Sequence, residues 1–370
     1  MFKPDEITAV TRPLAEASTL PPTAYTSAEI FQKELDTLFR HEWICVAREE
    51  QLPEPGHYRS VTVGRQPLIV ARQFDGTIKA MSAICPHRGM PVVDSHGQGT
   101  GFSCPYHLWK FGLDGHLISA PLMDDVADFP NGNCNLASIQ AESWQGFIFV
   151  NLAPHAAPLA NRLGELNLLV DGYDMQDMVI AGSVSFDSPW NWKILIENFM
   201  EAYHHIGPHN ESLQSTYPAK RSNVSGSVED GWSVLHMPSV AEKGEGLPPL
   251  PNLNERQAGE TLASVIMPTF CWINTPAVAF WYQLNPKAHD DMDLVIHALL
   301  PRSLAEAEGG HDLGQLVLEG VKHIHLEDIA VNMGPWQGLQ APLTRQGRLS
   351  LLEESIWQLN NWWVKRVANG

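Results

Sequence analysis

The chain has 370 residues, 44% of them hydrophobic, with 24 basic and 42 acidic side chains and a formal charge of −18. This length suits one or two domains with a sizeable core, and the acidic balance disfavours a general nucleic-acid binder, which needs clustered Lys and Arg. No stretch approaches the ~18 apolar residues of a membrane span, and no apolar signal-peptide core opens the chain. We therefore expect a soluble, cytoplasmic protein that binds neither nucleic acid nor membranes.

The first two dozen residues are rich in Pro and Thr and should wrap over the surface. A helix is expected next, because Thr26 and Glu29 have capping-box spacing and an apolar stripe follows them. The stripe consists of Ile30, Phe31, Leu35, Leu38 and Phe39.

From about Trp43 to Leu152, short β-rich segments alternate with Gly, Pro and Asp turns, which predicts a small antiparallel domain. An Asp114-Gly115 turn predicts a hairpin within it. The Ala/Pro-rich residues 154–158 suit a domain boundary. The clearest predicted strands are Tyr58–Val63, Leu68–Ala71 and Gly146–Leu152.

The remainder predicts a helix ending near His205, a loop-rich stretch to about Gly259, and then a sheet with helices packed on it. We thus expect an N-terminal segment, 1–42, that packs on the last domain, a β domain, 43–153, and an α+β domain, 154–370. In the last domain, strands are expected at Ala277–Leu284 and Asp293–Leu300 and helices at Leu313–Asn332 and Leu349–Val367.

Five cysteines, an odd number without a secretion signal, argue against a disulfide framework. Metal ligation or simple burial is the better expectation. We expect Cys45, Cys134 and Cys271 to be small core residues.

The other two cysteines belong to a C-x-H motif at Cys85 and His87 and a C-x2-H motif at Cys104 and His107, with sixteen residues between them. Zinc, which binds Cys₂His₂ tetrahedrally, is the first alternative. Each cysteine, however, precedes its histidine within one tight loop. Each loop can therefore give a thiolate to one iron and an imidazole to the other, as in a Rieske centre.

The segment Cys85–Leu117 resembles the Rieske domain of ring-hydroxylating and related oxygenases. The resemblance implies that Cys85, His87, Cys104 and His107 hold a [2Fe–2S] cluster.

A second group of polar residues lies in the segment 190–209, on one face of the expected helix. Taken alone, this pattern also fits the solvated face of an amphipathic helix. Gly207-Pro208 should end the helix, so His209, five residues after His204, can lie beside it. The polar face consists of Glu197, Asn198, Glu201, His204 and His205.

The same segment resembles the mononuclear-iron motif of Rieske oxygenases, with N-W-K, E-N, an acidic residue, Y-H and a second His. The resemblance implies that His204 and His209 bind iron and that Glu201 links it to the Rieske cluster of a neighbouring subunit. One oxygen of Glu201 should accept a hydrogen bond from His204, leaving the other for a Rieske histidine. Glu rather than Asp at this place resembles members acting on carnitine- or betaine-like amines. His205 is off the motif.

Two imidazoles and one carboxylate form the facial triad of non-haem iron oxygenases, with positions left open for O₂. Asp328 is the predicted carboxylate, because it is centred on an apolar stripe where an unpaired carboxylate is costly. The opposite side of that helix is apolar too, which leaves Glu327 as the competing carboxylate. The resemblance favours Asp328, since the family has an E-D pair on a C-terminal helix. Glu327, His323 and His325 fall outside the stripe.

The resemblance covers about Phe39 to Trp363 and implies an α+β fold, with a Rieske antiparallel β domain followed by a helix-grip catalytic domain. It implies the terminal oxygenase of a multicomponent system, in which O₂ hydroxylates a small organic substrate, with demethylation where the carbon carries N or O. No Rossmann fingerprint is present, so a separate NAD(P)H reductase or ferredoxin must supply electrons. The family also implies a homotrimer or a larger ring-based homo-oligomer.

Three alternatives stay open: an aromatic-ring cis-dihydroxylating dioxygenase, an electron-transfer protein of ferredoxin type, and an iron-sensing protein. The substrate is not set by the sequence. Aromatic cages suit cations, and Trp281 and Tyr282 are candidate walls.

Overall fold

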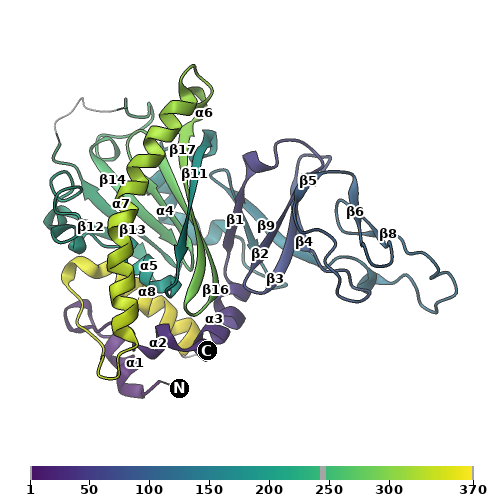
Figure 1. Ribbon diagram of the computed structural model, residues 1–370, viewed down its shortest axis with the longest axis horizontal. Helices are drawn as coiled ribbons and strands as arrows, with labels where there is room; N and C mark the ends of the chain where they lie inside the picture. Colours follow the sequence, from purple (N-terminus) through teal and green to yellow (C-terminus); the bar gives the residue numbers. More distant parts are fainter. Residues whose placement is uncertain (1, 242–246, 369–370) are drawn as a thin grey trace. The chain divides into compact units, whose positions relative to one another are not determined.

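The computed structural model describes residues 2–241 and 247–368, whose course Figure 1 shows. The chain divides into two compact units: the smaller is Phe39–Pro158, and the larger combines Met1–Leu38 with Leu159–Gly370. The predicted boundaries after residues 42 and 153 stay a prediction. Residues 1, 242–246 and 369–370 lie outside the described part. The first and last residues of the predicted domains, and part of the predicted loop-rich stretch, fall on these residues.

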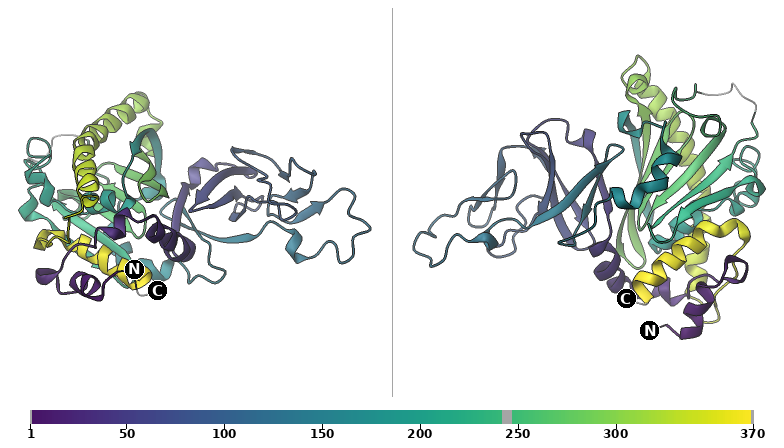
Figure 2. Two further views of the ribbon diagram at one scale, coloured as in Figure 1. Left: turned by 60° about the horizontal axis from the view of Figure 1, so that its bottom comes forward. Right: turned by 180° about the vertical axis from the view of Figure 1, so that it is seen from behind.

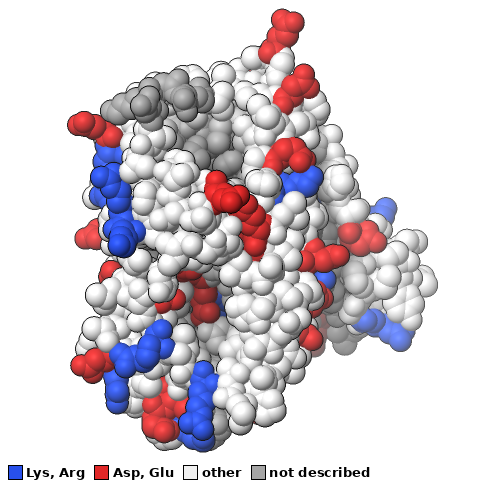
Figure 3. Space-filling view, turned by 60° about the vertical axis from the view of Figure 1, so that its left-hand side comes forward, with Lys and Arg blue, Asp and Glu red and all other residues white. Residues whose placement is uncertain are grey.

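On the face shown in Figure 3, acidic and basic side chains are interspersed with wide uncharged areas. Among the described helices, none combines the length and the apolar character that a membrane span requires.

An antiparallel seven-stranded sheet forms the body of the smaller unit, beside a sheet of three short strands. The strands are β1 (Ile44–Arg48), β2 (His57–Val63), β3 (Gln66–Arg72), β4 (Ile78–Ser82), β5 (His96–Gln98), β6 (Gly101–Ser103), β7 (Lys110–Gly112), β8 (Leu117–Ser119), β9 (Ser138–Trp144) and β10 (Phe147–Asn151). Their order is β1-β10-β9-β4-β3-β2-β5 in the large sheet and β6-β7-β8 in the small one. Every residue of β10 is buried, as expected of an apolar run between two neighbouring strands.

The strands predicted in this unit coincide with β2, β3 and β10, apart from one or two residues at their ends. The predicted hairpin joins β7 to β8, which pair in an antiparallel arrangement. Its Gly115 has φ +85°, a backbone conformation that favours glycine, and its N–H donates to the carbonyl of Gly112 (2.9 Å).

A second antiparallel sheet of seven strands forms the centre of the larger unit, in the order β11-β17-β16-β15-β14-β13-β12. The bounds are β11 (Met178–Ser188), β12 (Asn223–Ser227), β13 (Trp232–Pro238), β14 (Glu260–Ile266), β15 (Phe270–Asn274), β16 (Ala279–Ala288) and β17 (Asp291–Pro301). The last two contain most of the strands predicted at Ala277–Leu284 and Asp293–Leu300.

The helices of the chain are mostly short, with one long exception. They are α1 (Pro4–Val10), α2 (Thr23–Thr26), α3 (Ala28–His41), α4 (Ala160–Val170), α5 (Trp192–Phe199), α6 (Arg302–Ala305), α7 (Gly310–Leu339) and α8 (Glu354–Trp363). Short 3₁₀ turns lie at Leu14–Glu16, Glu49–Gln51, Gly132–Cys134, Met175–Asp177, Tyr203–Ile206, Ala219–Arg221, Gln257–Gly259 and Leu351–Glu353, and a π-helical turn follows α8 at Val364–Ala368.

The long helix α7 runs along one face of the larger sheet (Figure 1). Its Gly314 lies against β11, where a Cβ would stand 2.8 Å from the carbonyl oxygen of Ala181, so a larger side chain would push the helix away. The helix continues past the predicted end at Asn332 and through Pro335. Proline removes one helical hydrogen bond, and its exposure lets solvent reach the backbone there.

The predicted N-cap of helix α3 is wrong by one residue. Ser27 Oγ accepts the N–H of Ile30 (3.3 Å), whereas Thr26 belongs to the preceding turn α2. Proline favours the start of a helix, and Pro21-Pro22 start that extra turn. The apolar stripe of α3 is buried as predicted, apart from the half-buried Ile30.

A buried carboxylate joins three elements of the larger unit. Glu34 of α3 accepts hydrogen bonds from Lys193 Nζ (2.6 Å) and Trp192 Nε1 (3.0 Å) of α5 and from Trp363 Nε1 (2.6 Å) of α8. Neither Glu34 nor Lys193 is exposed. Figure 2 shows the N-terminal and C-terminal helices side by side, so both ends of the chain pack around α5.

We predict that Glu34→Ala lowers the free energy of unfolding by roughly 3–5 kcal/mol, because it leaves the buried Lys193 ammonium without the carboxylate that it is hydrogen-bonded to. Urea unfolding followed by tryptophan fluorescence measures the loss. The control is Glu29→Ala on the exposed side of α3, which should change little. The double variant Glu34→Leu/Lys193→Met should recover only part of the loss, because it removes the buried charge but leaves the indole N–H groups of Trp192 and Trp363 unpaired. A single variant as stable as the control would contradict this role.

Candidate metal centres

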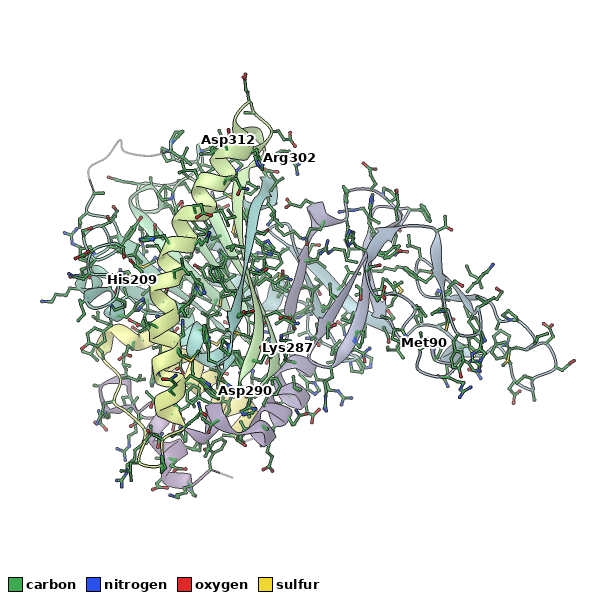
Figure 4. The ribbon with its side chains drawn as sticks, viewed as in Figure 1. Met90, His209, Lys287, Asp290, Arg302 and Asp312 are labelled. Atoms are coloured by element: carbon green, nitrogen blue, oxygen red, sulfur yellow. The ribbon has the colours of Figure 1, made fainter. Side chains whose placement is uncertain are left out.

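The two Cys-His loops of the smaller unit share one backbone design. In each, the cysteine N–H donates to the carbonyl of the residue five positions later: Cys85 to Met90 (2.9 Å) and Cys104 to Trp109 (2.8 Å). Figure 4 labels Met90 at the end of the first loop. Each cysteine is thereby fixed at the start of a six-residue loop.

The fifth residue of each loop makes the return turn. Gly89 (φ +74°) and Leu108 (φ +57°) both have left-handed backbone, and each donates its N–H to the cysteine carbonyl (3.0 Å in both loops). Glycine adopts this conformation without strain. Leu108 lacks that freedom, so the hydrogen bonds of the loop must hold it there.

The four predicted ligands come together at these loops. Both thiols are buried, and burial together with the neighbouring Cys104 thiol raises the pKa of Cys85. The rings of His87 and His107 lie 4.6 Å apart. His107 Nδ1 is buried and has no hydrogen-bond partner among the described residues. Two facing thiols, paired imidazoles and an unpaired ring nitrogen fit a [2Fe–2S] cluster bound by Cys₂His₂.

Aromatic neighbours fix both imidazoles. His87 is stacked on Trp109 (4.7 Å, interplanar angle 3°) and His107 on Tyr106 (3.8 Å). The guanidinium of Arg88 lies over the Tyr106 ring (5.0 Å). Stacking restricts the rotation of each ring and so orients its ligand nitrogen.

The N-W-K segment of the larger unit anchors α5. The Asn191 side chain accepts the N–H of Lys193 (3.1 Å) and so caps the helix. Its amide donates to the carbonyls of Tyr25 (3.0 Å) and His289 (2.9 Å). The side chains of Trp192 and Lys193 donate hydrogen bonds to Glu34. Asn191, Trp192 and Lys193 therefore all position α5.

The prediction of a helix continuing to His205 is wrong. Helix α5 ends at Phe199, and Tyr203–Ile206 forms a separate 3₁₀ turn. A continuous helix would pair the N–H of His204 with the carbonyl of Met200. That N–H instead donates to Glu201 Oε2 (2.9 Å), and such local side-chain bonds compete with helix formation.

The structure brings together the three predicted iron ligands. One ligand atom each from His204, His209 and Asp328 lies within 4.8 Å of the other two. Asp328 Oδ1 stands 2.9 Å from His209 Nε2 and 3.6 Å from His204 Nε2. Figure 4 shows His209 beside α7, the helix that carries Asp328. Two imidazoles and one carboxylate converging on a single point fit a facial triad.

A second carboxylate supports each histidine. His204 Nδ1 lies 2.6 Å from Glu201 Oε1, and His209 Nδ1 lies 2.6 Å from Glu327 Oε2. Donation from Nδ1 fixes the tautomer that leaves Nε2 free to bind a metal. Glu327 also accepts the Ser212 hydroxyl hydrogen (2.7 Å).

Two features of the carboxylates that support the histidines differ from the sequence predictions. The sequence placed Glu327 only as a rival for the ligand role, although its carboxylate reaches the second histidine. From the sequence, we expected one oxygen of Glu201 to stay free of hydrogen bonds within the chain. Instead, both oxygens accept hydrogen bonds from His204. A carboxylate has about four acceptor sites, which leaves Glu201 able to accept one more.

The other polar residues of the predicted face point elsewhere. The Tyr25 hydroxyl donates to Glu197 (2.6 Å), and burial raises the pKa of this carboxyl to about 7. His205 Nδ1 pairs with the carbonyl of Tyr217 (3.0 Å), and burial lowers its pKa to about 4. Neither residue belongs to the triad.

A cavity of about 360 Å³ adjoins the triad. His204, His209 and Asp328 line it together with residues of the sheet, α5 and α7. Tyr282 lines the cavity. Its neighbour Trp281 is outside the lining and is stacked on His297 (4.7 Å). Only one of the two predicted aromatic walls therefore faces this space.

Comparison with known proteins finds a family model for each of the two parts of the chain that hold these residues. Residues 42–130 match the Rieske [2Fe–2S] domain, and residues 175–369, more than half of the chain, match the ring hydroxylating alpha subunit catalytic domain. The chain belongs to the ring hydroxylating alpha subunit family.

Known relatives of this alpha subunit include a carnitine monooxygenase oxygenase subunit of Acinetobacter pittii (strain PHEA-2), 32% identical over 60% of this chain. A glycine betaine monooxygenase oxygenase subunit of Chromohalobacter salexigens is 34% identical over 53% of it. The alignments span 57% and 44% of the relatives' own lengths. A solved quaternary ammonium Rieske monooxygenase has the same fold (TM-score 0.80, 22% identity, 98% of this chain and 97% of that one).

These comparisons confirm the family and the α+β fold class, with a Rieske domain followed by a catalytic domain. They also confirm, for the family, the predicted cofactors, a [2Fe–2S] cluster and a mononuclear iron. The individual ligands, Cys85, His87, Cys104, His107, His204, His209 and Asp328, stay predictions that rest on the geometry above.

We predict that Asp328→Ala removes the mononuclear iron, whereas Glu327→Gln weakens its binding about 10- to 100-fold, the usual effect of losing a group that orients a ligand. Iron retention against a chelator measures both, and the visible Rieske spectrum of the same samples should stay unchanged. Glu319→Gln is the matched control, an exposed carboxylate of α7 paired with Lys322. A reversed order of the two effects would make Glu327 the ligand.

Proposed function

We propose that this chain is the terminal oxygenase component of a multicomponent Rieske system, which hydroxylates a small organic substrate using O₂ and electrons from a separate NAD(P)H-dependent reductase or ferredoxin. The observation that carries the proposal is the convergence of His204, His209 and Asp328 beside a cavity of about 360 Å³. Iron held there would supply O₂ activation. The protein itself binds the substrate, orients both imidazoles and excludes water. We place this activity in the cytoplasm, where NAD(P)H is available.

Glu201 has the position of an electron-transfer link. Beyond its bonds to His204, it lines a second cavity of about 400 Å³ together with Tyr25, Glu197 and Glu353. It thus faces two cavities, and its remaining acceptor capacity is available to a Rieske histidine, His87 or His107, of another copy. The quaternary ammonium Rieske monooxygenase is described as showing inter-subunit electron transfer, and we propose the same route here, within a homotrimeric ring.

Aromatic-ring dihydroxylation is the second candidate, and the lining of the cavity favours it. Most of the side chains around it are aliphatic or aromatic, as a hydrocarbon ring would require. The relatives that act on carnitine and glycine betaine favour hydroxylation next to nitrogen followed by demethylation. Product analysis with a reconstituted reductase distinguishes a cis-diol from an aldehyde.

Metal content is the direct test of the proposal. Purified without oxygen, each chain should hold about three irons and two acid-labile sulfides, as a Rieske centre plus one mononuclear site requires. The reduced protein should give a Rieske-type EPR spectrum. Zinc at Cys85 and Cys104 without labile sulfide would refute the proposal.

We also predict that Glu201→Gln blocks electron transfer between the sites. Like Glu327→Gln, it should weaken iron binding about 10- to 100-fold, so the measurement uses protein loaded with excess Fe(II). The variant keeps its size and loses the charge that stabilises the His204 imidazole. Stopped-flow absorbance should show normal cluster reduction by the partner but much slower reoxidation with substrate and O₂. Glu211→Gln, a nearby exposed carboxylate, should behave like the parent. Parental reoxidation in Glu201→Gln, or full activity of a strict monomer, would contradict the link.

A further inference from the structure

The proposed function leaves the substrate open, and the cavity beside the triad narrows it. We propose that this cavity takes an uncharged, largely apolar small molecule with one hydrogen-bonding group, and that His325 binds that group. The inference rests on the proposed function, since it takes the cavity lined by His204, His209 and Asp328 to be the substrate site.

Size and lining set the first limit. A volume of about 360 Å³ is near the lower end of ordinary ligand pockets, about 300–1,000 Å³. The walls come from the sheet, α5 and α7, and most are aliphatic or aromatic, such as Leu213, Ile273, Phe280 and Ile324. Such walls favour a substrate that buries apolar surface.

Charge sets the second limit. No Lys or Arg stands among the described residues that line the cavity. A substrate carboxylate would therefore lose its hydration without meeting a cationic partner, which is strongly unfavourable. It would also lie near Glu201 and Asp328, the two carboxylates of the described lining. Carnitine and glycine betaine both carry a carboxylate.

A cationic group finds no free counter-charge either. Both oxygens of Glu201 accept hydrogen bonds from His204, and Asp328 faces the two imidazoles of the triad. A metal cation at the triad would add positive charge to this end of the cavity. An uncharged substrate avoids both penalties.

Most polar groups of the lining are already paired within the protein. Thr261 Oγ1 donates to the Tyr217 hydroxyl (3.0 Å), Thr275 Oγ1 donates to the carbonyl of Val278 (2.9 Å), and His205 is bonded to Tyr217. These three side chains have little to offer a substrate, whereas the Tyr217 hydroxyl accepts from Thr261 and keeps its own hydrogen to donate.

Two side chains of the lining keep a buried polar atom with no partner among the described residues, Nδ2 of Asn198 and Nε2 of His325. Asn198 also lines the second cavity on the Glu201 side, whereas His325 is not in the described lining of that cavity. Buried polar atoms in native structures nearly always have partners. His325 lines the cavity and has no hydrogen-bond partner among the described residues, so a bound molecule can supply one.

His325 is well placed for this role. It lies one helical turn before Asp328 on α7 and is 1% exposed. Its ring centroid is 4.3 Å from that of Phe186 and 6.2 Å from that of Tyr282. Burial lowers its pKa, which favours the uncharged ring over the imidazolium cation that a substrate carboxylate would need. A neutral imidazole has one N–H and one acceptor nitrogen and can pair with either kind of group.

The test measures binding to the metal-loaded protein, without reductase and without oxygen, by equilibrium dialysis. Naphthalene, indole and quinoline are flat bicyclic molecules of similar size that differ in having no polar group, an N–H donor or a ring-nitrogen acceptor. At least one of the two polar probes should bind about 3- to 10-fold more tightly than naphthalene, the effect of one neutral hydrogen bond. Carnitine and choline should not displace them.

Variants at His325 separate its hydrogen bond from its packing. His325→Leu should abolish the preference for the polar probe while naphthalene binding changes little, and His325→Gln should retain part of the preference. His311→Leu, at an exposed position of the same helix, is the control. The inference is overturned if carnitine or choline binds more tightly than the neutral probes, if no neutral probe binds, or if the preference survives in His325→Leu.

The same samples keep this inference apart from the proposed function. Iron, labile sulfide and the Rieske spectrum are measured before dialysis. Intact metal centres with the wrong binding pattern overturn only the substrate assignment. Absent sulfide overturns the proposed function, whatever the probes do.

Discussion

The catalytic centre of this alpha subunit depends on one buried carboxylate that lies outside it. Glu34 holds the ammonium of Lys193 and two indole N–H groups, and these donors come from α5 and α8. Neither member of the ion pair is exposed to water. Their mutual attraction and the hydrogen bonds to Glu34 therefore compensate for the hydration that both groups lose on burial. Helix α5 is thereby fixed at its first turn, and the chain that follows it carries both histidines of the triad.

From that anchored helix, local polar competition produces the geometry of the site. Glu201 accepts a hydrogen bond from the backbone N–H of His204. This bond interrupts the helical hydrogen-bond pattern, and the chain then turns toward α7. The same carboxylate then accepts from the imidazole, as Glu327 does for His209 on the opposite side. Both rings are held by their outer nitrogens, so their inner nitrogens converge on Asp328.

Much of this was predictable from the sequence where the signal is local or carried by motif spacing. The Cys-His loops, the two histidines around Gly207-Pro208 and the strands with clear turns fall in this class. The end of α5 was missed because helical periodicity takes no account of a side chain that competes for a backbone N–H. Glu327, Ser212 and His325 were missed as supporting or lining groups, because their roles come from contacts between elements more than one hundred residues apart or from burial against the sheet. The cap of α3 shifted by one residue because two prolines start another turn just before it.

The interleaving of the two units has a consequence for how the polypeptide matures during synthesis. The smaller unit is one continuous stretch, Phe39–Pro158, inserted between two parts of the larger one. It has all its strands as soon as that stretch has left the ribosome, and domains generally fold as they emerge. The larger unit must wait, since Trp363 completes the shell around Glu34 and a bridge joins Ser18 to Arg348. The first thirty-eight residues therefore lack part of their final partners until nearly the whole chain has been translated.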